Sequence, residues 1–182
     1  TVLPFVPDPQ HRPLLCVSAL AEHTKNLLAD PRVSLSLVQP DADDVHDCPR
    51  LTLVATAERI VPEPSLLARY LRYLPDTEAL LALDFMFFRL QPIRLRYIGG
   101  VGRMGWLEVQ HWNELPSLSA EAEKDFLHAA SSMTDHAIRL LGADCFGIDY
   151  EVQGKRKRRD FAQGLTAETF GARALEVVAE LG

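Results

Sequence analysis

Apolar and polar residues alternate along the first two-thirds of the chain, a pattern typical of β-strands that bury one face. The segment Arg32–Val38 (RVSLSLV) shows it most clearly and predicts a half-buried strand. Turn-forming residues at 7–13 separate two short apolar runs, which predicts a β-hairpin with a longer loop. The other strands are expected at 1–6, 14–18, 51–61, 85–98 (bent at Pro92) and 104–110.

Helical patterns are short in the first part of the chain and longer in the last third. A helix over 19–30 ends at Asp30, because a following proline disfavours helical backbone. Further helices are expected at 63–73, 77–83, from 119 to about 141 and at 166–181, the last with Thr166 near a capping arrangement with Glu168 and Thr169. Residues 39–49 read as a loop, and a hairpin over 146–161 turns at Gly154.

The composition changes near residues 113–119, where strands give way to helices. We therefore expect two domains, at 1–113 and 119–182. The segregated elements predict an α+β protein, mainly β, with a barrel or sheet domain followed by a small helix–hairpin–helix domain.

Composition narrows the class of protein. The chain has 182 residues, of which 47% are hydrophobic and 24% are charged, as in ordinary globular domains. Its net charge of −6 argues against bulk attraction to nucleic acid or to anionic membranes. No apolar run reaches the roughly 20 residues of a membrane helix. Three widely spaced cysteines and no visible secretory signal favour free thiols and the cytoplasm. Because the chain opens in strand-like sequence without Met, we expect residues before Thr1 in the gene product.

Three patterns receive a structural interpretation. The run 100–105 (GVGRMG) spells a dinucleotide-binding motif, but no helix of the required kind follows, so a tight turn or close backbone approach is expected. The basic run 155–159 (KRKRR) is interpreted as a solvated hairpin arm rather than a site for nucleic acid or an acidic partner. His128, Asp135 and His136 are expected on one helix, without the spacing that a metal site requires.

The segment 18–26 (SALAEHTKN) carries candidate chemistry. It places a hydroxyl at the end of a strand, followed by His23, Thr24 and Lys25 in the first turns of a helix. Free backbone N–H groups and the helix dipole favour an anion at such a place. The alternative is an ordinary capped surface helix.

Segments 16–38 (CVSALAEHTKNLLADPRVSLSLV) and 49–61 (PRLTLVATAERIV) resemble the FMN-binding split barrels of the pyridoxamine 5′-phosphate oxidase-like superfamily. Residues 90–107 (LQPIRLRYIGGVGRMGWL) are similar to a bacterial subgroup related to the HugZ-type haem-utilisation proteins. This resemblance implies an antiparallel, Greek-key split β-barrel followed by a helix–hairpin–helix domain. The subgroup's HMNxDH motif corresponds here to 131–136 (SSMTDH), which keeps Asp135 and His136 but lacks the leading His and the Asn.

The resemblance also implies a cofactor site. The first strand, at residues 1–5, would contact the flavin ring through its backbone. His23 stands where the family has a phosphate-binding lysine. Glu22 replaces an arginine, and Thr1 and Val6 stand where basic residues are usual, so positive charge is lost. The implied cofactor-binding residues are Thr1, Val2, Leu3, Ser18, His23, Thr24 and Arg50. No catalytic residue and no metal ligand is assigned.

The first hypothesis is an FMN-binding flavoprotein, an oxidoreductase acting on an unknown small molecule. The second is a haem-binding or haem-degrading protein, although the last histidine of the chain is His136, so a ligand from a C-terminal tail is either absent or replaced. The third is a split-barrel binding module without a cofactor. The resemblance further implies a bacterial homodimer with the cofactor at the interface, and the aromatic run 85–88 is consistent with a large buried surface.

Overall fold

The computed structural model describes residues 1–38, 48–100 and 102–181, which divide into two units. Unit 1 is formed by the described residues of Thr1–Pro7, Arg12–Val61 and Leu81–Leu115. Unit 2 is formed by Asp8–His11, Pro62–Leu80 and the described residues from Pro116 on. The last boundary falls within the stretch where the composition changes. The sequence gives no indication that residues 62–80 belong to unit 2, because this depends on contacts between segments that are distant in the chain.

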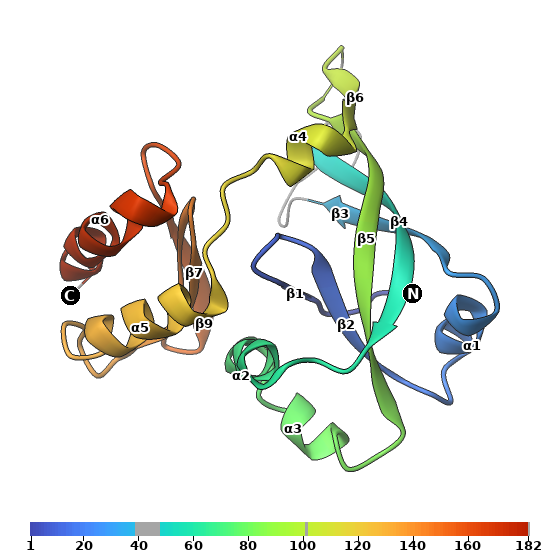
Figure 1. Cartoon of the computed structure of the whole chain (residues 1–182), viewed down its shortest axis with the longest axis horizontal. Coiled ribbons are helices and arrows are strands. Elements are labelled where there is room, and N and C mark those ends of the chain that lie inside the picture. The colour runs from blue at the N-terminus through green and yellow to red at the C-terminus, as the bar shows by residue number, and fades with distance from the viewer. Residues whose placement is uncertain (39–47, 101, 182) are drawn as a thin grey trace. The chain divides into compact units, whose positions relative to one another are not determined.

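Unit 1 is built on an antiparallel sheet with the strand order β1-β2-β5-β4-β3, in which β6 also pairs with β5 (Figure 1). Its strands are β1 (Val6–Pro7), β2 (Pro13–Ser18), β3 (Arg32–Val38), β4 (Arg50–Ile60), β5 (Phe85–Ile98) and β6 (Met104–Glu108). The hairpin of β1 and β2 confirms the turn predicted between them. Two expectations were wrong. Residues 1–5 are not in a strand, and Pro4 has no N–H to donate to one. The strand expected at 104–110 ends at Glu108, where α4 (Val109–Asn113) begins.

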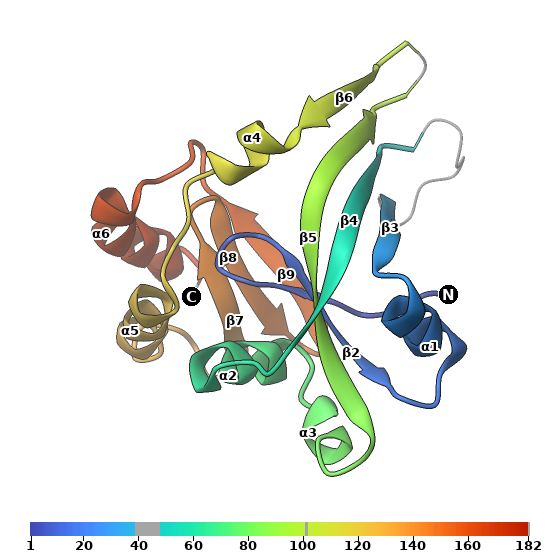
Figure 2. The same ribbon diagram turned by 45° about the vertical axis from the view of Figure 1, so that its right-hand side comes forward.

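Strand β5 organises this sheet. It pairs with β4 from Phe87 to Ile98, with β2 along its first half and with β6 along its second half (Figure 2). Val54 lies opposite Arg94 and Ala55 opposite Pro92, so Ile93 is an extra residue that forms a β-bulge. The bulge places Pro92, which lacks an N–H, beside the irregularity and explains the bend predicted there.

The core of unit 1 follows from the alternation of β4. Leu53, Ala55 and Ala57 are buried on one face, and Leu90 and Leu95 of β5 pack in the same cluster. The helix α1 (Glu22–Ala29) connects β2 to β3 and contributes Leu27 to the edge of this cluster. The helix predicted at 19–30 is therefore present but shorter. Of the loop expected at 39–49, residues 39–47 lie outside the described residues.

Unit 2 contains a three-stranded antiparallel sheet, β7-β8-β9, against which helices α5 and α6 pack. Its elements are α2 (Pro64–Tyr73), α3 (Thr77–Leu80), α5 (Ala120–Ala130), β7 (Ile138–Asp144), β8 (Gly147–Val152), β9 (Lys155–Asp160) and α6 (Ala167–Ala179). The expected hairpin is present as β8 and β9. It turns at Gln153 and Gly154, whose φ angles of 51° and 72° fit a tight hairpin turn. Thr166 and Thr169 form a capping box at the start of α6, which confirms the predicted cap.

The long helix predicted from 119 to about 141 is wrong. Helix α5 ends at Ala130, because the hydroxyls of Ser131 and Ser132 donate to the carbonyls of His128 and Ala129 at 2.7 and 3.0 Å. The chain then turns and enters β7. The C-terminal part is thus a helix, three strands and a helix rather than a helix–hairpin–helix. His128 and His136 do not share a helix.

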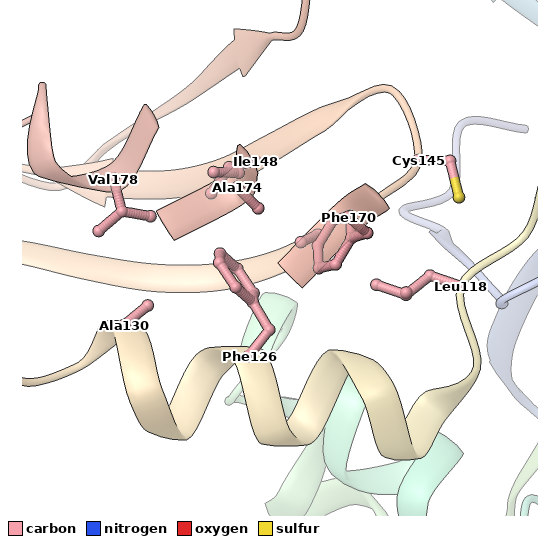
Figure 3. Packing of buried hydrophobic residues seen from close by; sticks show 9 residues of the cluster. Leu118, Phe126, Ala130, Cys145, Ile148, Phe170, Ala174 and Val178 are labelled. Atoms are coloured by element: carbon pink, nitrogen blue, oxygen red, sulfur yellow. The ribbon is translucent and has the colours of Figure 1, made fainter. Parts of the chain in front are cut away.

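The core of unit 2 lies between this sheet and helices α5 and α6 (Figure 3). Phe126 of α5 and Phe170 of α6 meet edge to face, with ring centroids 5.1 Å apart. Ile148 of β8 and Ala174 and Val178 of α6 complete the contact, and Figure 3 shows these side chains between the two helices and the strands.

A buried ion cluster joins α2 to the rest of unit 2. Glu123 of α5 is 3% exposed and pairs with Arg69 and Arg72 of α2, the latter at 3.0 Å. Its carboxylate also accepts the N–H of Ala143 at 3.0 Å. Burying a carboxylate is costly unless charges and hydrogen bonds compensate it, and here they do so on several sides. No described helix is long and apolar enough to cross a membrane.

Gly142 is required beside this cluster, which gives a stability prediction. A Cβ at Gly142 would overlap the Tyr73 hydroxyl and lie 2.8 Å from Glu123 Oε1. We expect Gly142→Ala to lower the free energy of unfolding by about 1–3 kcal/mol, measured by urea denaturation. The matched control is Gly171→Ala in α6, where nothing lies within 4 Å of the new Cβ. This control should instead stabilise the protein by about 0.5–1 kcal/mol. Equal effects of the two substitutions would contradict the role of the cluster.

Candidate functional site

The sequence-predicted site centres on the turn between β2 and α1. Ser18 ends β2, and its hydroxyl accepts the N–H of Leu20 at 3.2 Å while its carbonyl accepts the N–H of Ala21 at 3.1 Å. These two bonds reverse the chain so that α1 can begin at Glu22. Ala21 caps the helix without a side-chain hydrogen bond. Helix α1 therefore lacks the polar cap that most helices carry at this end.

His23 and Thr24, in the first turn of α1, each hold an unsatisfied polar atom. Thr24 is fully buried, and its Oγ1 has no hydrogen-bond partner among the described residues. His23 Nε2 is likewise enclosed and without a partner among them. A buried polar group without a partner costs free energy, and most such groups in native proteins are satisfied. Two neighbouring exceptions on one helical turn mark a place where a ligand can supply the missing partner.

The first residues of the chain lie beside this turn. Thr1 Oγ1 is 3.5 Å from His23 Nδ1, so Nδ1, unlike Nε2, has a partner at the limit of hydrogen bonding. Val2 is fully exposed, whereas Leu3 packs against the core of unit 1. The structure thus brings together Thr1, His23 and Thr24 of the predicted set. The backbone contact proposed for residues 1–3 stays a prediction.

Arg50 occupies a different part of the sheet. It begins β4, opposite Val38 and Ile98. Six residues further along β4, Thr56 pairs with Arg32, the residue that starts β3 after α1. At about 3.3 Å per residue, Arg50 is therefore roughly 20 Å along the strand from that pair. A role for Arg50 in binding a cofactor stays a prediction.

An apolar cavity adjoins Ser18. Its volume is about 360 Å³, and its walls are Ser18, Leu20, Ala82, Leu83, Asp84 and Phe85. The β2–β5 register sets Ser18 opposite Phe85, and the N–H of Ala19 donates to the Asp84 carbonyl at 2.7 Å. Leu20 is 76% exposed and Leu83 61% exposed, which is unusual for leucine. Sequence reasoning missed Leu83 and Phe85, because only the strand order shows that they meet Ser18.

The charges near α1 are mostly paired with each other. Lys25, the one lysine or arginine in α1, lies 3.7 Å from the carboxylate of Glu22. After the helix, the Arg32 guanidinium donates to Asp30 at 3.0 Å and lowers the pKa of that carboxyl to about 2. This pair explains the DPR sequence, because it fixes the step from α1 into β3. A phosphate at α1 would therefore meet neutral donors and an already paired lysine.

The other singled-out segments have structural roles. Between β5 and β6, the Gly99 N–H donates to the Arg103 carbonyl at 2.7 Å and the Arg103 N–H donates to the Gly100 carbonyl at 3.1 Å. Gly100 and Gly102 have positive φ angles, as expected for a tight turn. In the basic run of β9, Arg158 pairs with Asp144, Asp149 and Asp160. Burial opposes the charge of Arg158, but Asp144 and Asp149 outweigh it and raise the pKa of the guanidinium. Among the described residues no cluster of three potential metal ligands occurs. The three cysteines are free thiols, as predicted.

The unsatisfied hydroxyl of Thr24 gives a testable prediction. We expect Thr24→Val to raise the free energy of unfolding of the ligand-free protein by about 1 kcal/mol, because it removes a buried polar group and keeps the shape. Chemical denaturation measures the change. The matched control is Thr166→Val, which removes the cap of α6 and should destabilise by about 1 kcal/mol. A loss of stability in Thr24→Val would show that its hydroxyl is satisfied in solution.

Comparison with known proteins extends this picture. No protein-family model matches the chain. It is 36% identical over 103 residues to a chloroplastic haem oxygenase of Arabidopsis thaliana, HOZ, a match that covers 56% of this chain. The matched segment is 32% of the length of that relative, so the chain corresponds to about a third of it.

Solved structures share the fold over nearly the whole chain. A haem-binding protein from Mycobacterium smegmatis aligns with a TM-score of 0.55 and 25% identity, covering 94% of this chain and 81% of that one. Atu2129 from Agrobacterium tumefaciens, of unknown function, aligns with a TM-score of 0.72 and 22% identity, covering 97% and 82%. This second likeness shows the fold alone. Together these findings confirm that the chain resembles the split barrels of the pyridoxamine 5′-phosphate oxidase-like superfamily and, among them, the HugZ-type haem-utilisation proteins.

Proposed function

We propose that this protein binds haem beside helix α1, with His23 as the iron ligand. The observation that carries the proposal is the enclosed Nε2 atom of His23, which has no hydrogen-bond partner among the described residues. Histidine is the side chain that most often binds metals, and it is the usual proximal ligand of haem iron. An imidazole nitrogen with no other bond to break is suited to that role.

The Thr1 hydroxyl favours the tautomer of His23 that a metal requires. Thr1 Oγ1 lies 3.5 Å from His23 Nδ1 and can accept a proton held there. With the proton on Nδ1, the lone pair of Nε2 is free for a metal. Second-sphere partners of this kind orient ligating histidines in many metal sites.

The cavity next to Ser18 offers apolar surface to an edge of the porphyrin. Leu20, Leu83 and Phe85 line it, and the two leucines are largely exposed. Ligand sites combine apolar walls with a few placed polar groups. The cavity supplies apolar walls, and His23 follows Leu20, one of its lining residues, by three positions. When bound, haem would bring its iron redox chemistry, while the protein's residues would hold and shield it.

The comparisons support this choice of cofactor over flavin. Two relatives are haem proteins by name, and one of them aligns over 94% of the chain at 25% identity. Because the chain corresponds to about a third of the Arabidopsis oxygenase, our proposal covers haem binding and leaves haem degradation as a prediction.

FMN is the second candidate, favoured by the Thr24 hydroxyl. Thr24 Oγ1 and the His23 ring are unsatisfied donors in the helical turn where the split barrels hold the flavin phosphate. Both can donate to a phosphate. The pairing of Lys25 with Glu22 leaves α1 without the charge-assisted bonds that make phosphate sites strong. A flavin oxidoreductase acting on a small molecule therefore stays a prediction.

Haem titration tests the proposal. We expect the purified chain to bind haem saturably, with a Soret band typical of histidine ligation. His23→Ala should weaken binding by about tenfold or more, equivalent to ~1.4 kcal/mol, and change the band position. The control is His128→Ala, whose side chain is exposed at the end of α5. It should bind as the wild type does.

A parallel titration with FMN separates the two candidates. Saturable FMN binding that Thr24→Val weakens, together with haem binding that His23→Ala leaves unchanged, would overturn the haem proposal in favour of the flavin. Haem binding equally weakened by His128→Ala would show that the site is not at α1.

A further inference from the structure

Strand β9 of unit 2 concentrates positive charge at an open edge. Its first five residues are lysine or arginine, and all six of its residues are exposed. It pairs with β8 on one side, and no described strand pairs with its outer edge (Figure 2). An open edge offers backbone N–H and C=O groups to an extended segment of another protein.

The hairpin of β8 and β9 determines which backbone groups face outward. Lys155 directly follows the two-residue turn, so it forms a hydrogen-bonded pair with β8. At the other end, the N–H of Phe161 donates to the Phe146 carbonyl at 2.8 Å. Bonded pairs alternate along antiparallel strands, and both ends agree on an alternation in which the odd-numbered residues bond to β8. The N–H and C=O groups of Arg156 and Arg158 therefore point to the outer edge.

The two faces of β9 differ in how far their charges are compensated. On one face, Arg158 pairs with three aspartates and Arg156 donates to a backbone carbonyl of α2. On the other face, the side chains of Lys155 and Lys157 form no ion pair or hydrogen bond with any described residue. The uncompensated charge of β9 is therefore on this second face, the lysine face.

A cavity borders the lysine face at the end of the strand. Its volume is about 520 Å³, and its apolar walls include Phe161 and Leu165. Arg159 also lines it and lies opposite Ile148, a core residue, so the lysine face is the one against which α6 packs. Arg159 pairs with Glu180 of α6 at 3.3 Å, but both side chains are more than half exposed. Such a pair is weak and leaves the cavity accessible.

We propose that β9 accepts an extended acidic segment of a different protein, which pairs with its outer edge in antiparallel fashion. The residues of that segment opposite Lys155 and Lys157 carry carboxylates, and the residue opposite Arg159 places an apolar side chain in the cavity. All three positions are non-hydrogen-bonded pairs, in which facing side chains come closest. Backbone bonds supply affinity, while the charges and the cavity supply selectivity. This partner is distinct from the second copy implied by the family resemblance, which stays a prediction.

A polypeptide fits this surface better than a nucleic acid does. Asp160 and Glu180 line the cavity and would repel a chain of phosphates. Phosphates also accept hydrogen bonds but cannot donate to the outward carbonyls of β9. The net charge of −6 further opposes binding of nucleic acid. The basic run, interpreted from the sequence as a solvated arm, thus gains a partner from the open edge and the cavity.

The other open edges offer less to an acidic segment. Strand β1 consists of Val6–Pro7 alone and is too short. The outer edge of β7 is already engaged, because Arg72 donates to the Leu141 carbonyl at 2.9 Å and Ala143 donates to Glu123 at 3.0 Å. Strands β3 and β6 each contain a single charged residue. Among the described edges, β9 is therefore the one that matches an acidic partner.

A designed peptide tests the proposal. The probe is the blocked peptide TFTETET, whose phenylalanine would lie opposite Arg159 and whose glutamates would lie opposite Lys157 and Lys155. We expect fluorescence anisotropy to show saturable binding to the purified chain. Lys157→Glu should raise the dissociation constant at least about tenfold, because like charges then face each other. The peptide TFTKTET should bind this variant more tightly than it binds the wild type.

The control variant is Lys124→Glu in α5, which makes the same change of charge at an exposed lysine outside β9. It should bind TFTETET as the wild type does. Replacing the phenylalanine by alanine, in TATETET, should weaken binding several-fold, because the cavity then stays unfilled. No binding of TFTETET, or equal losses in Lys124→Glu and Lys157→Glu, would overturn the proposal.

Hydrogen exchange followed by NMR tests the strand pairing itself. Bound TFTETET should slow exchange of the Arg156 and Arg158 amides, which point outward, and leave the amide of Lys157, already bonded to β8, nearly unchanged. Binding without this protection would overturn the pairing at the edge. Tighter binding of a single-stranded RNA than of TFTETET, lost in Lys157→Glu, would assign the surface to nucleic acid and overturn the proposal.

Discussion

The register of strand β5 is the constraint on which the rest of unit 1 depends. With one extra residue at Ile93, this strand of 14 residues pairs with β4 from Phe87 on, with β2 at its beginning and with β6 at its end. The first pairing sets Phe85 opposite Ser18 and so forms the cavity beside α1. The second sets Trp106 opposite Arg96 and leaves β6 at the edge. A slip by one residue would reverse the face of every side chain and remove both features.

Buried polar groups are left without partners in α1 but are compensated in unit 2. In α1, the unsatisfied atoms of His23 and Thr24 cost stability in the ligand-free chain, which is typical of residues kept for a ligand. In unit 2, the charge of Glu123 is fully compensated by two arginines and a backbone N–H. Burial and the neighbouring Asp149 also raise the pKa of Tyr73, so this phenol stays protonated and donates to the Asp149 carboxylate at 2.7 Å.

Local patterns predicted much of the fold, because alternation and turn residues act over a few positions. Strand Arg32–Val38, the turn at Gly154 and the cap at Thr166 all have this origin. The prediction that the helix continues beyond Ala130 was wrong. The apolar pattern remains helical there, but the hydroxyls of Ser131 and Ser132 bond to carbonyls of the last turn and end the helix. In the candidate site, family motifs indicated Ser18, His23 and Thr24. Leu83 and the pairing of Arg69 with Glu123, 54 residues apart, were not predictable, because they depend on strand order and packing.

Binding of haem iron by the Nε2 atom of His23 is open to a spectroscopic test. Resonance Raman spectra of the ferrous haem complex are recorded with the protein's histidines labelled with ¹⁵N. We expect an iron–histidine stretching band that shifts with the label and disappears in His23→Gln. A band that persists unchanged in His23→Gln, or a complex whose spectrum does not respond to the label, would contradict it.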